Sequence, residues 1–195
     1  GISLIKHCAF HTKMRGAQFV LLGSAPDPKI QADFQNLGAS LGDENAAFVF
    51  SYDEPLSHLI YAGCDIVCVP SIFEPCGLTQ LIAMRFGAVP VVRQTGGLYD
   101  TVFDVDHDQA RAAWDMLGVS NPEDVKKPEF QATNGFSFGG TDNNSLNYAL
   151  DRALDSFYND QDWFRSLQAR AMRQDWSWNR PAMTYLELYH QAKKN

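Results

Sequence analysis

The residues of this sequence with the clearest chemical potential gather in the stretch FEPCGLTQL, at 73–81. Glu74 comes soon after the apolar run DIVCVP, and Gly77 stands just before a pattern of helical spacing. The start of a helix offers unpaired backbone amides and the positive end of the helix dipole, and phosphate groups often bind there. Glycine lets the backbone approach a ligand closely because it carries no Cβ atom. The stretch therefore predicts an acidic side chain beside an anion-binding site, with capping of the helix by Glu74 as the structural alternative.

A second glycine-containing stretch, TGGL at 95–98, repeats this arrangement after the apolar run VPVVR. Gly96 and Gly97 would then open toward the same edge of the protein as Glu74. By itself, a Thr-Gly-Gly stretch indicates a simple turn more often than a binding site. Both interpretations are therefore kept at this point.

The elements that position these residues are short apolar runs that alternate with stretches of helical spacing. The runs are almost entirely apolar, which is typical of strands covered on both faces. Alternation with such short connections predicts an α/β fold with a doubly wound, Rossmann-like parallel sheet. In such a sheet, ligands bind outside the carboxyl ends of the strands, where Glu74 is placed. The predicted strands lie within AQFVLLG (17–23), AAFVFSY (46–52), DIVCVP (65–70) and VPVVR (89–93).

The second half of the chain is more polar and less regular. Residues 104–133 are interrupted by prolines and predict a surface insertion with one helical turn around 110–116. NGFSF, at 134–138, predicts a last strand, and helical periodicity follows over 144–193. We expect residues 1–195 to form one domain.

Composition and charge exclude several classes of function. A net charge of −7 without a basic cluster argues against nucleic acid and anionic membranes as partners. The apolar runs are too short to cross a bilayer. His7 and His11 have a spacing that can bind a metal, but no carboxylate or cysteine is placed to complete the site. We predict no metal site and no cofactor.

Long blocks of the sequence carry a specific resemblance. SIFEPCGLTQL, AMRFGAVPVVRQTGGLYDTVFD, SYDEPLSHLIYAG and DWSWNRPAMTYLELYH are similar to the donor domain of bacterial glycogen synthases and plant starch synthases. These enzymes form family 5 of the glycosyltransferases and have the two-domain GT-B architecture. LLGSAPDPKIQADF and GGLYDTVFDVDHD most resemble the soluble starch synthases of class III. The resemblance covers nearly the whole chain except 104–133.

The resemblance implies a function and roles for single residues. The donor would be ADP-glucose, the acceptor the non-reducing end of an α-1,4-glucan, with retention at the anomeric carbon and an N-terminal acceptor domain as partner. The location would be the plastid. Glu74 falls on the acidic residue near the donor glucose, which makes it the candidate catalytic residue. Tyr52 falls on an aromatic residue that stacks on adenine. The other expected substrate-binding residues are His58, Cys76, Gly77, Leu78, Thr79, Gly96 and Gly97.

The sequence also departs from the wider GT-B pattern. Ile82 stands where many GT-B enzymes have a second glutamate, but the glycogen and starch branch lacks that acid too. In this family, the position that corresponds to Gly1 is preceded by the first strand of the sheet and by an Arg and a Lys that bind phosphate. Arg85 and Arg93 are no obvious substitutes for these two phosphate-binding residues. We therefore expect residues 1–195 alone to transfer no glucose. The alternative function is a non-catalytic module that binds nucleotide or glucan and associates with starch enzymes.

Overall fold

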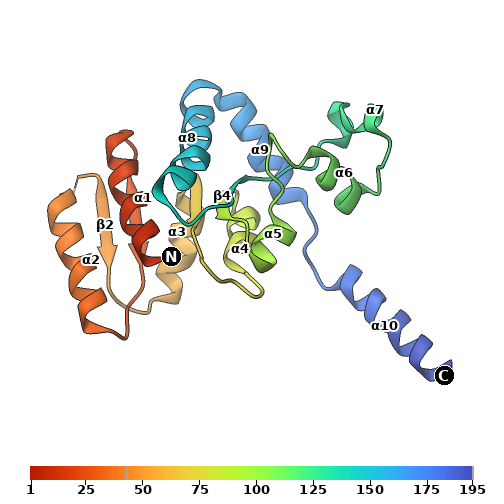
Figure 1. The fold of residues 1–195 in the computed structure, drawn as a ribbon, viewed down its shortest axis with the longest axis horizontal. Coiled ribbons are helices and arrows are strands. Elements are labelled where there is room, and N and C mark those ends of the chain that lie inside the picture. Colours follow the sequence, from red (N-terminus) through yellow and green to blue (C-terminus); the bar gives the residue numbers. More distant parts are fainter. Residues whose placement is uncertain (43, 195) are drawn as a thin grey trace.

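Helices and parallel strands alternate along the chain in the computed structural model, which describes residues 1–42 and 44–194. The strands form two parallel sheets, one with the order β1-β2 and one with the order β3-β4-β5 (Figure 1). The predicted α/β class with a parallel arrangement of strands is confirmed. The strands are β1 (Phe19–Leu22), β2 (Ala46–Val49), β3 (Ile66–Val69), β4 (Val89–Arg93) and β5 (Phe136–Phe138).

The single sheet that we predicted is divided between β1 and β3, which are not paired among the described strands. Each part keeps a regular parallel register: Phe19 lies opposite Ala46, and Ile66 lies opposite Val89. The carboxyl ends of β3, β4 and β5 therefore share one edge of the larger sheet.

Local sequence signals explain where several helices begin. Asp27, Asp53, Asp142 and Asp160 each accept a hydrogen bond from a backbone amide of the helix that follows, which satisfies a donor that would otherwise be unpaired. The helices are α1 (Ile2–Met14), α2 (Pro28–Leu41), α3 (Glu54–Gly63), α4 (Thr79–Phe86), α5 (Gly96–Thr101), α6 (Gln109–Leu117), α7 (Pro122–Val125), the short 3-10 helix η1 (Pro128–Phe130), α8 (Asn143–Asn159), α9 (Gln161–Arg173) and α10 (Asn179–Lys194).

Helix α1 connects the two parts of the fold. Leu4 and Cys8 pack in the main core, which α1 shares with β4, β5, α8 and α9. Ala9, on the same helix, packs in a second cluster with α2 and β2. Each large apolar side chain buried in these clusters stabilises the fold by about 1.5–3 kcal/mol. Because α1 contributes to both clusters, the divided sheet is held together through a helix (Figure 1).

The segment 104–133 is more ordered than the predicted surface insertion. Helix α6 has nine residues where we expected one turn. Ala112 and Ala113 are fully buried, and Ala112 forms a cluster with Phe103 and Ala132. None of residues 114–131 is buried, so most of the segment lies on the surface, and it is anchored to the interior through Ala112 and Ala132.

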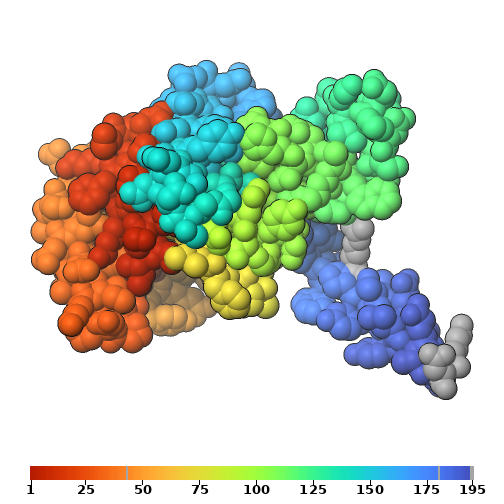
Figure 2. Space-filling view, viewed as in Figure 1, coloured from red at the N-terminus to blue at the C-terminus, as the bar shows by residue number. Residues whose placement is uncertain are grey.

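Helix α10 extends away from the rest of the chain (Figures 1 and 2). Its large apolar side chains lie half or more exposed, among them Met183, Tyr185, Leu186 and Tyr189. An amphipathic helix normally buries one such face, so this surface is a candidate for contact with another domain or chain. Within the described part of the chain, no helix combines the length and apolar character needed to cross a membrane.

Candidate functional site

The two glycine-containing stretches of the sequence meet at the carboxyl ends of β3 and β4. The amide of Gly97 donates a hydrogen bond of 3.3 Å to the carbonyl oxygen of Glu74. A Cβ atom at Gly96 would overlap this oxygen, and one at Gly97 would overlap the carbonyl oxygen of Cys76. The turn formed by TGGL therefore packs directly on the loop between β3 and α4 (residues 70–78, the Glu74 loop). This close approach requires glycine at positions 96 and 97.

A buried glutamine fixes the geometry of these loops. Gln80 is fully buried, and its Nε2 donates to the carbonyl oxygen of Gly77 at 2.9 Å and to Oγ1 of Thr101 at 2.8 Å. Thr101 in turn donates to the carbonyl oxygen of Gly97 at 2.6 Å. Gly77 has a φ of +69°, a conformation that favours glycine. The sequence prediction gave Gln80 no role, although it lies within FEPCGLTQL; an amide among apolar helix residues was the available signal.

The start of α4 faces this loop without a side-chain cap. Leu78 occupies the N-cap position and makes no capping hydrogen bond, whereas Leu78 and Thr79 are both exposed. Glu74 does not cap the helix: its half-buried carboxylate accepts a hydrogen bond of 3.2 Å from the hydroxyl of Ser71. The capping alternative for Glu74 is therefore not observed. The unpaired amides and the helix dipole remain available for an anion.

The start of α1 lies beside the same loop. A Cβ atom at Gly1 would overlap the carbonyl oxygen of Pro70, the residue that follows β3. Gly1 is the N-cap of α1. The positive ends of α1 and α4 thus both lie near the loop after β3, which favours negative charge there.

Arg93, at the end of β4, joins two of the loops on this edge. Its Nη1 donates to the carbonyl oxygen of Ile72 at 2.9 Å, and its Nε donates to that of Gly140 at 3.2 Å. The guanidinium group thus contacts the first loop two residues before Glu74. Arg85 instead lies along α4 and donates to the carbonyl oxygen of Met172. Neither arginine had a predicted role, and the structure places Arg93 at the site as a positioning residue.

Tyr52 and His58 lie apart from this group of loops. Tyr52 follows β2, at the carboxyl end of the smaller sheet; it is 88% exposed, and its hydroxyl donates to Glu54 at 3.5 Å. His58 lies on α3 and stacks on Phe86, with the ring centroids 6.1 Å apart. Phe86 is the last residue of α4, so this contact lies about 10 Å along the helix from the amides at its start. The ring of Tyr52 is open to a ligand, whereas His58 packs on an aromatic ring.

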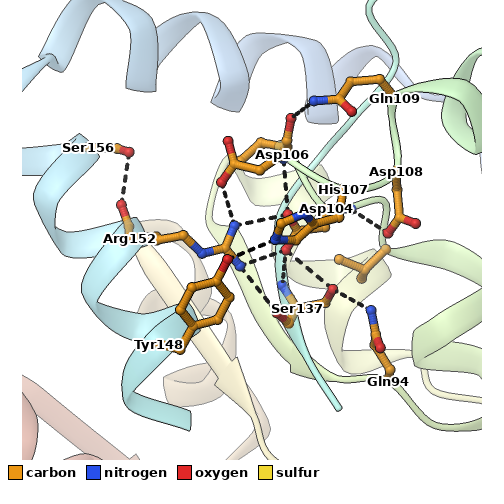
Figure 3. A network of polar contacts seen from close by, with 12 residues as sticks. Gln94, Asp104, Asp106, His107, Asp108, Gln109, Ser137, Tyr148, Arg152 and Ser156 are labelled. Carbon is orange, nitrogen blue, oxygen red and sulfur yellow. Dashed lines mark hydrogen bonds and ion pairs between the residues drawn. The ribbon is translucent and has the colours of Figure 1, made fainter. Parts of the chain in front are cut away.

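A network of ion pairs and hydrogen bonds joins strand β5 to Asp104 and to helix α8 (Figure 3). Asp104 is fully buried and accepts hydrogen bonds of 2.9 Å from both terminal nitrogens of Arg152. The backbone amide of Ser137 also donates to it, at 2.6 Å. Burial raises the pKa of Asp104, but the hydrogen bonds from Arg152, Asp106 and Ser137 outweigh burial, so this pKa lies below its ordinary value. A carboxylate held ionised in this way positions the backbone and is not a proton donor.

The two histidines with metal-binding spacing are engaged with α8. His7 is hydrogen-bonded to Asn147 at 2.8 Å, and His11 to Asp151 at 2.6 Å. Among the residues that the structure describes, no group of three His, Cys, Asp or Glu side chains is arranged to hold a metal ion. These histidines join α1 to α8.

The contact between Gly97 and Cys76 predicts a stability effect. Gly97→Ala should lower the free energy of unfolding by about 1–3 kcal/mol, the usual range for overpacking, because the new methyl group must displace backbone atoms. Urea unfolding measures this change. Gly63→Ala is the matched control, since no atom lies within 4 Å of a Cβ at Gly63. Equal stability of the two variants would contradict the close packing of the loops.

Comparisons with known proteins agree with this geometry. No protein-family model matches the chain. The chain is 58% identical over 197 residues to starch synthase 3, chloroplastic/amyloplastic, of Arabidopsis thaliana, covering 100% of this chain and 18% of that protein. It is 44% identical over 191 residues to glycogen synthase 2 of Methylococcus capsulatus, covering 97% of this chain and 36% of that protein. The chain therefore spans well under half the length of these relatives.

A solved structure extends the similarity to the fold. The catalytic domain of starch synthase IV from Arabidopsis thaliana, bound to ADP and acarbose, matches with a TM-score of 0.83 and 40% identity, over 100% of this chain and 36% of that one. Sucrose-phosphate synthase from Thermosynechococcus elongatus matches with a TM-score of 0.59 and 23% identity, over 97% of this chain and 42% of that one, which supports the fold alone. The expected resemblance to starch and glycogen synthases is confirmed.

Proposed function

We propose that this chain, a relative of plant starch synthases and bacterial glycogen synthases over nearly its whole length, is the donor-binding part of a retaining glucosyltransferase. The enzyme would move glucose from ADP-glucose to the non-reducing end of an α-1,4-glucan in starch synthesis. The observation that carries the proposal is the packing of Gly96 and Gly97 on the Glu74 loop beside the uncapped start of α4. This arrangement sets a carboxylate next to an anion site, which suits a donor that has both hydroxyl groups and phosphates.

The proposed roles follow from this arrangement. The loop of Cys76, Gly77, Leu78 and Thr79 would surround the glucose and the distal phosphate, with Gly96 and Gly97 as its second wall. Glu74 would contact the donor glucose, held in place by Ser71. In a front-face displacement, negative charge develops on the leaving diphosphate while the acceptor hydroxyl enters on the same side. Preorganised amides and helix dipoles stabilise that charge in the transition state.

Arg93 would act on this reaction through the loops that it joins. Its hydrogen bonds to the carbonyl groups of Ile72 and Gly140 fix the position of the Glu74 loop relative to β5. They also bring a positive charge to the edge at which the diphosphate would bind. His58 would act only indirectly, because its ring packs on Phe86.

The acceptor domain would come from the remainder of a longer protein. The chain covers 18% and 36% of the two relatives described above, which leaves ample length for such a domain. Helix α10 supports this partner, because Tyr185, Leu186 and Tyr189 are exposed on a helix that leaves the body of the chain. We infer a location in the plastid, as the name of the Arabidopsis starch synthase 3 states for that protein. The relatives do not favour the alternative of a non-catalytic module.

Tyr52 provides the test of the donor. In the full-length protein, glucosyl transfer to glycogen should be faster from labelled ADP-glucose than from UDP-glucose. Tyr52→Ala should raise the KM for ADP-glucose with a smaller change in kcat, because an exposed ring stacks on the base. A contact of this kind is worth about 1–3 kcal/mol in nucleic-acid complexes. Tyr52→Phe, which keeps the ring, is the matched control and should retain most of the affinity.

Two results would count against this assignment. Equal transfer from UDP-glucose would contradict the adenine-based donor. An unchanged KM in Tyr52→Ala, with a lowered melting temperature, would show that Tyr52 only packs against the protein.

A further inference from the structure

A cavity of about 720 Å³ lies between the segment 105–133 and helix α9. This volume is within the range typical of small-molecule sites, roughly 300–1,000 Å³. Its walls come from α6, α7, η1 and α9. Figure 1 shows α6 and α7 at one end of the body, beyond α9. The function proposed above assigns no role to this segment or to this cavity.

The cavity is separate from the edge at which the donor would bind. Ala132 and Thr133, which line the cavity, precede β5 in the chain. Gly139 and Gly140, which belong to the edge near Arg93, follow β5. Since the two groups lie at opposite ends of one strand, a ligand in the cavity would not overlap a nucleotide at the carboxyl edge.

Aromatic rings from three elements line the cavity. Trp114 of α6 is 59% exposed, although the neighbouring Ala112 and Ala113 are fully buried. Phe130 of η1 and Trp163 of α9 are half-buried. An exposed indole, in a cavity that two other rings also line, offers a flat apolar surface with a negative face, against which the C–H groups of a sugar ring can pack.

The polar groups of the cavity can hydrogen-bond to a carbohydrate. Among the described residues that line it there is no Asp or Glu, and its two cations are each hydrogen-bonded to a protein group. Lys126 pairs with Glu123 at 3.1 Å. The guanidinium of Arg170 donates to the carbonyl oxygen of Thr133 at 2.7 Å, to its hydroxyl at 3.3 Å and to Oε1 of Gln131 at 3.2 Å. The guanidinium of Arg170 is held by neutral oxygens, and the amide and hydroxyl groups of the lining can exchange hydrogen bonds with sugar hydroxyls.

We propose that this cavity binds a segment of an α-1,4-glucan chain, outside the donor site and through stacking on Trp114. The choice of an α-1,4-glucan rests on the proposed function, whereas the preference for a carbohydrate rests on the aromatic rings and hydrogen-bonding groups of the cavity. A second contact of this kind would hold the polymer near the enzyme between successive transfers. Its effect would therefore grow with the length of the glucan.

Trp114→Ala in the full-length protein tests the proposal. Native affinity electrophoresis in gels that contain glycogen, and titration with maltoheptaose, should show binding weakened by about tenfold, in line with the loss of one stacking contact. The KM for ADP-glucose and the kcat with a short soluble acceptor should not change. Trp114→Phe should restore most of the binding. Tyr158→Ala is the matched control, because Tyr158 is an exposed aromatic residue on α8 outside the cavity.

The possible outcomes separate this site from the donor site. Equal glucan binding by Trp114→Ala and the wild-type protein would overturn the proposal, as would competition of inorganic phosphate with maltoheptaose for the cavity. If the wild-type protein binds maltoheptaose through Trp114 but transfers no glucose from ADP-glucose, the cavity is supported and the proposed enzymatic function fails. If it transfers glucose but Trp114→Ala leaves glucan binding unchanged, the enzymatic function is supported and the glucan site in the cavity fails.

Discussion

Glu74→Gln in the full-length protein is expected to lower kcat by about two orders of magnitude or more while the fold is retained. Glu74 lies in the loop that leads into the uncapped start of α4, and Gly97 donates a hydrogen bond to its backbone carbonyl oxygen. Glutamine keeps the size of the side chain and can still hydrogen-bond to Ser71, so only the negative charge is lost. Steady-state transfer from ADP-glucose to glycogen measures the effect.

A matched control separates the effect of removing a negative charge at the site from the effect of removing one elsewhere in the protein. Glu44→Gln removes one acidic group at an exposed position before β2 and should leave kcat unchanged. Thermal unfolding should shift little for either variant, because Glu74 accepts a single side-chain hydrogen bond at a half-buried position. Near-normal turnover of Glu74→Gln would remove Glu74 from the chemistry and leave it a structural part of the loop.

Arg152→Met should produce the largest loss of stability, about 3–5 kcal/mol in the free energy of unfolding. Removing one partner of a buried ion pair costs this much because the other charge stays buried without compensation. Asp104 would be that charge, since it is fully buried and takes two hydrogen bonds from Arg152. Urea unfolding at neutral pH measures the loss. Arg165→Met, at an exposed position of α9, is the control and should change stability little.

The pH dependence gives this prediction a second readout. In the wild-type protein the pKa of Asp104 is lowered by folding. Its contribution to the free energy of unfolding is therefore present at pH values above the pKa that Asp104 has in the unfolded chain, and it is lost as the pH falls through the pKa of the folded state. In Arg152→Met, burial without the guanidinium should raise that pKa, so stability should fall as the pH rises. The stability difference between the two proteins should therefore widen between about pH 4 and pH 7. A constant difference over this range would contradict the pairing.

Much of the fold was determined by the sequence itself. Apolar runs of strand length between stretches of helical spacing identified β1 to β4, which the structure confirms. Glu74 and Gly77 were placed after β3 and before the start of α4 for the same reason. These features are local: periodicity and the conformational freedom of glycine act within a few residues of one another.

The tertiary structure alone decided which distant residues meet. It packed Gly96 and Gly97 on the Glu74 loop, joined Gln80 to Thr101, and placed Arg93 between two loops. It divided the sheet, and within the segment 104–133 it buried Ala112 and Ala132 against Phe103 and formed part of the wall of a cavity. Such contacts depend on the order of the strands and on how side chains fill space between elements. Neither leaves a periodic signal in the sequence, because residues far apart in the chain become neighbours only when the elements pack.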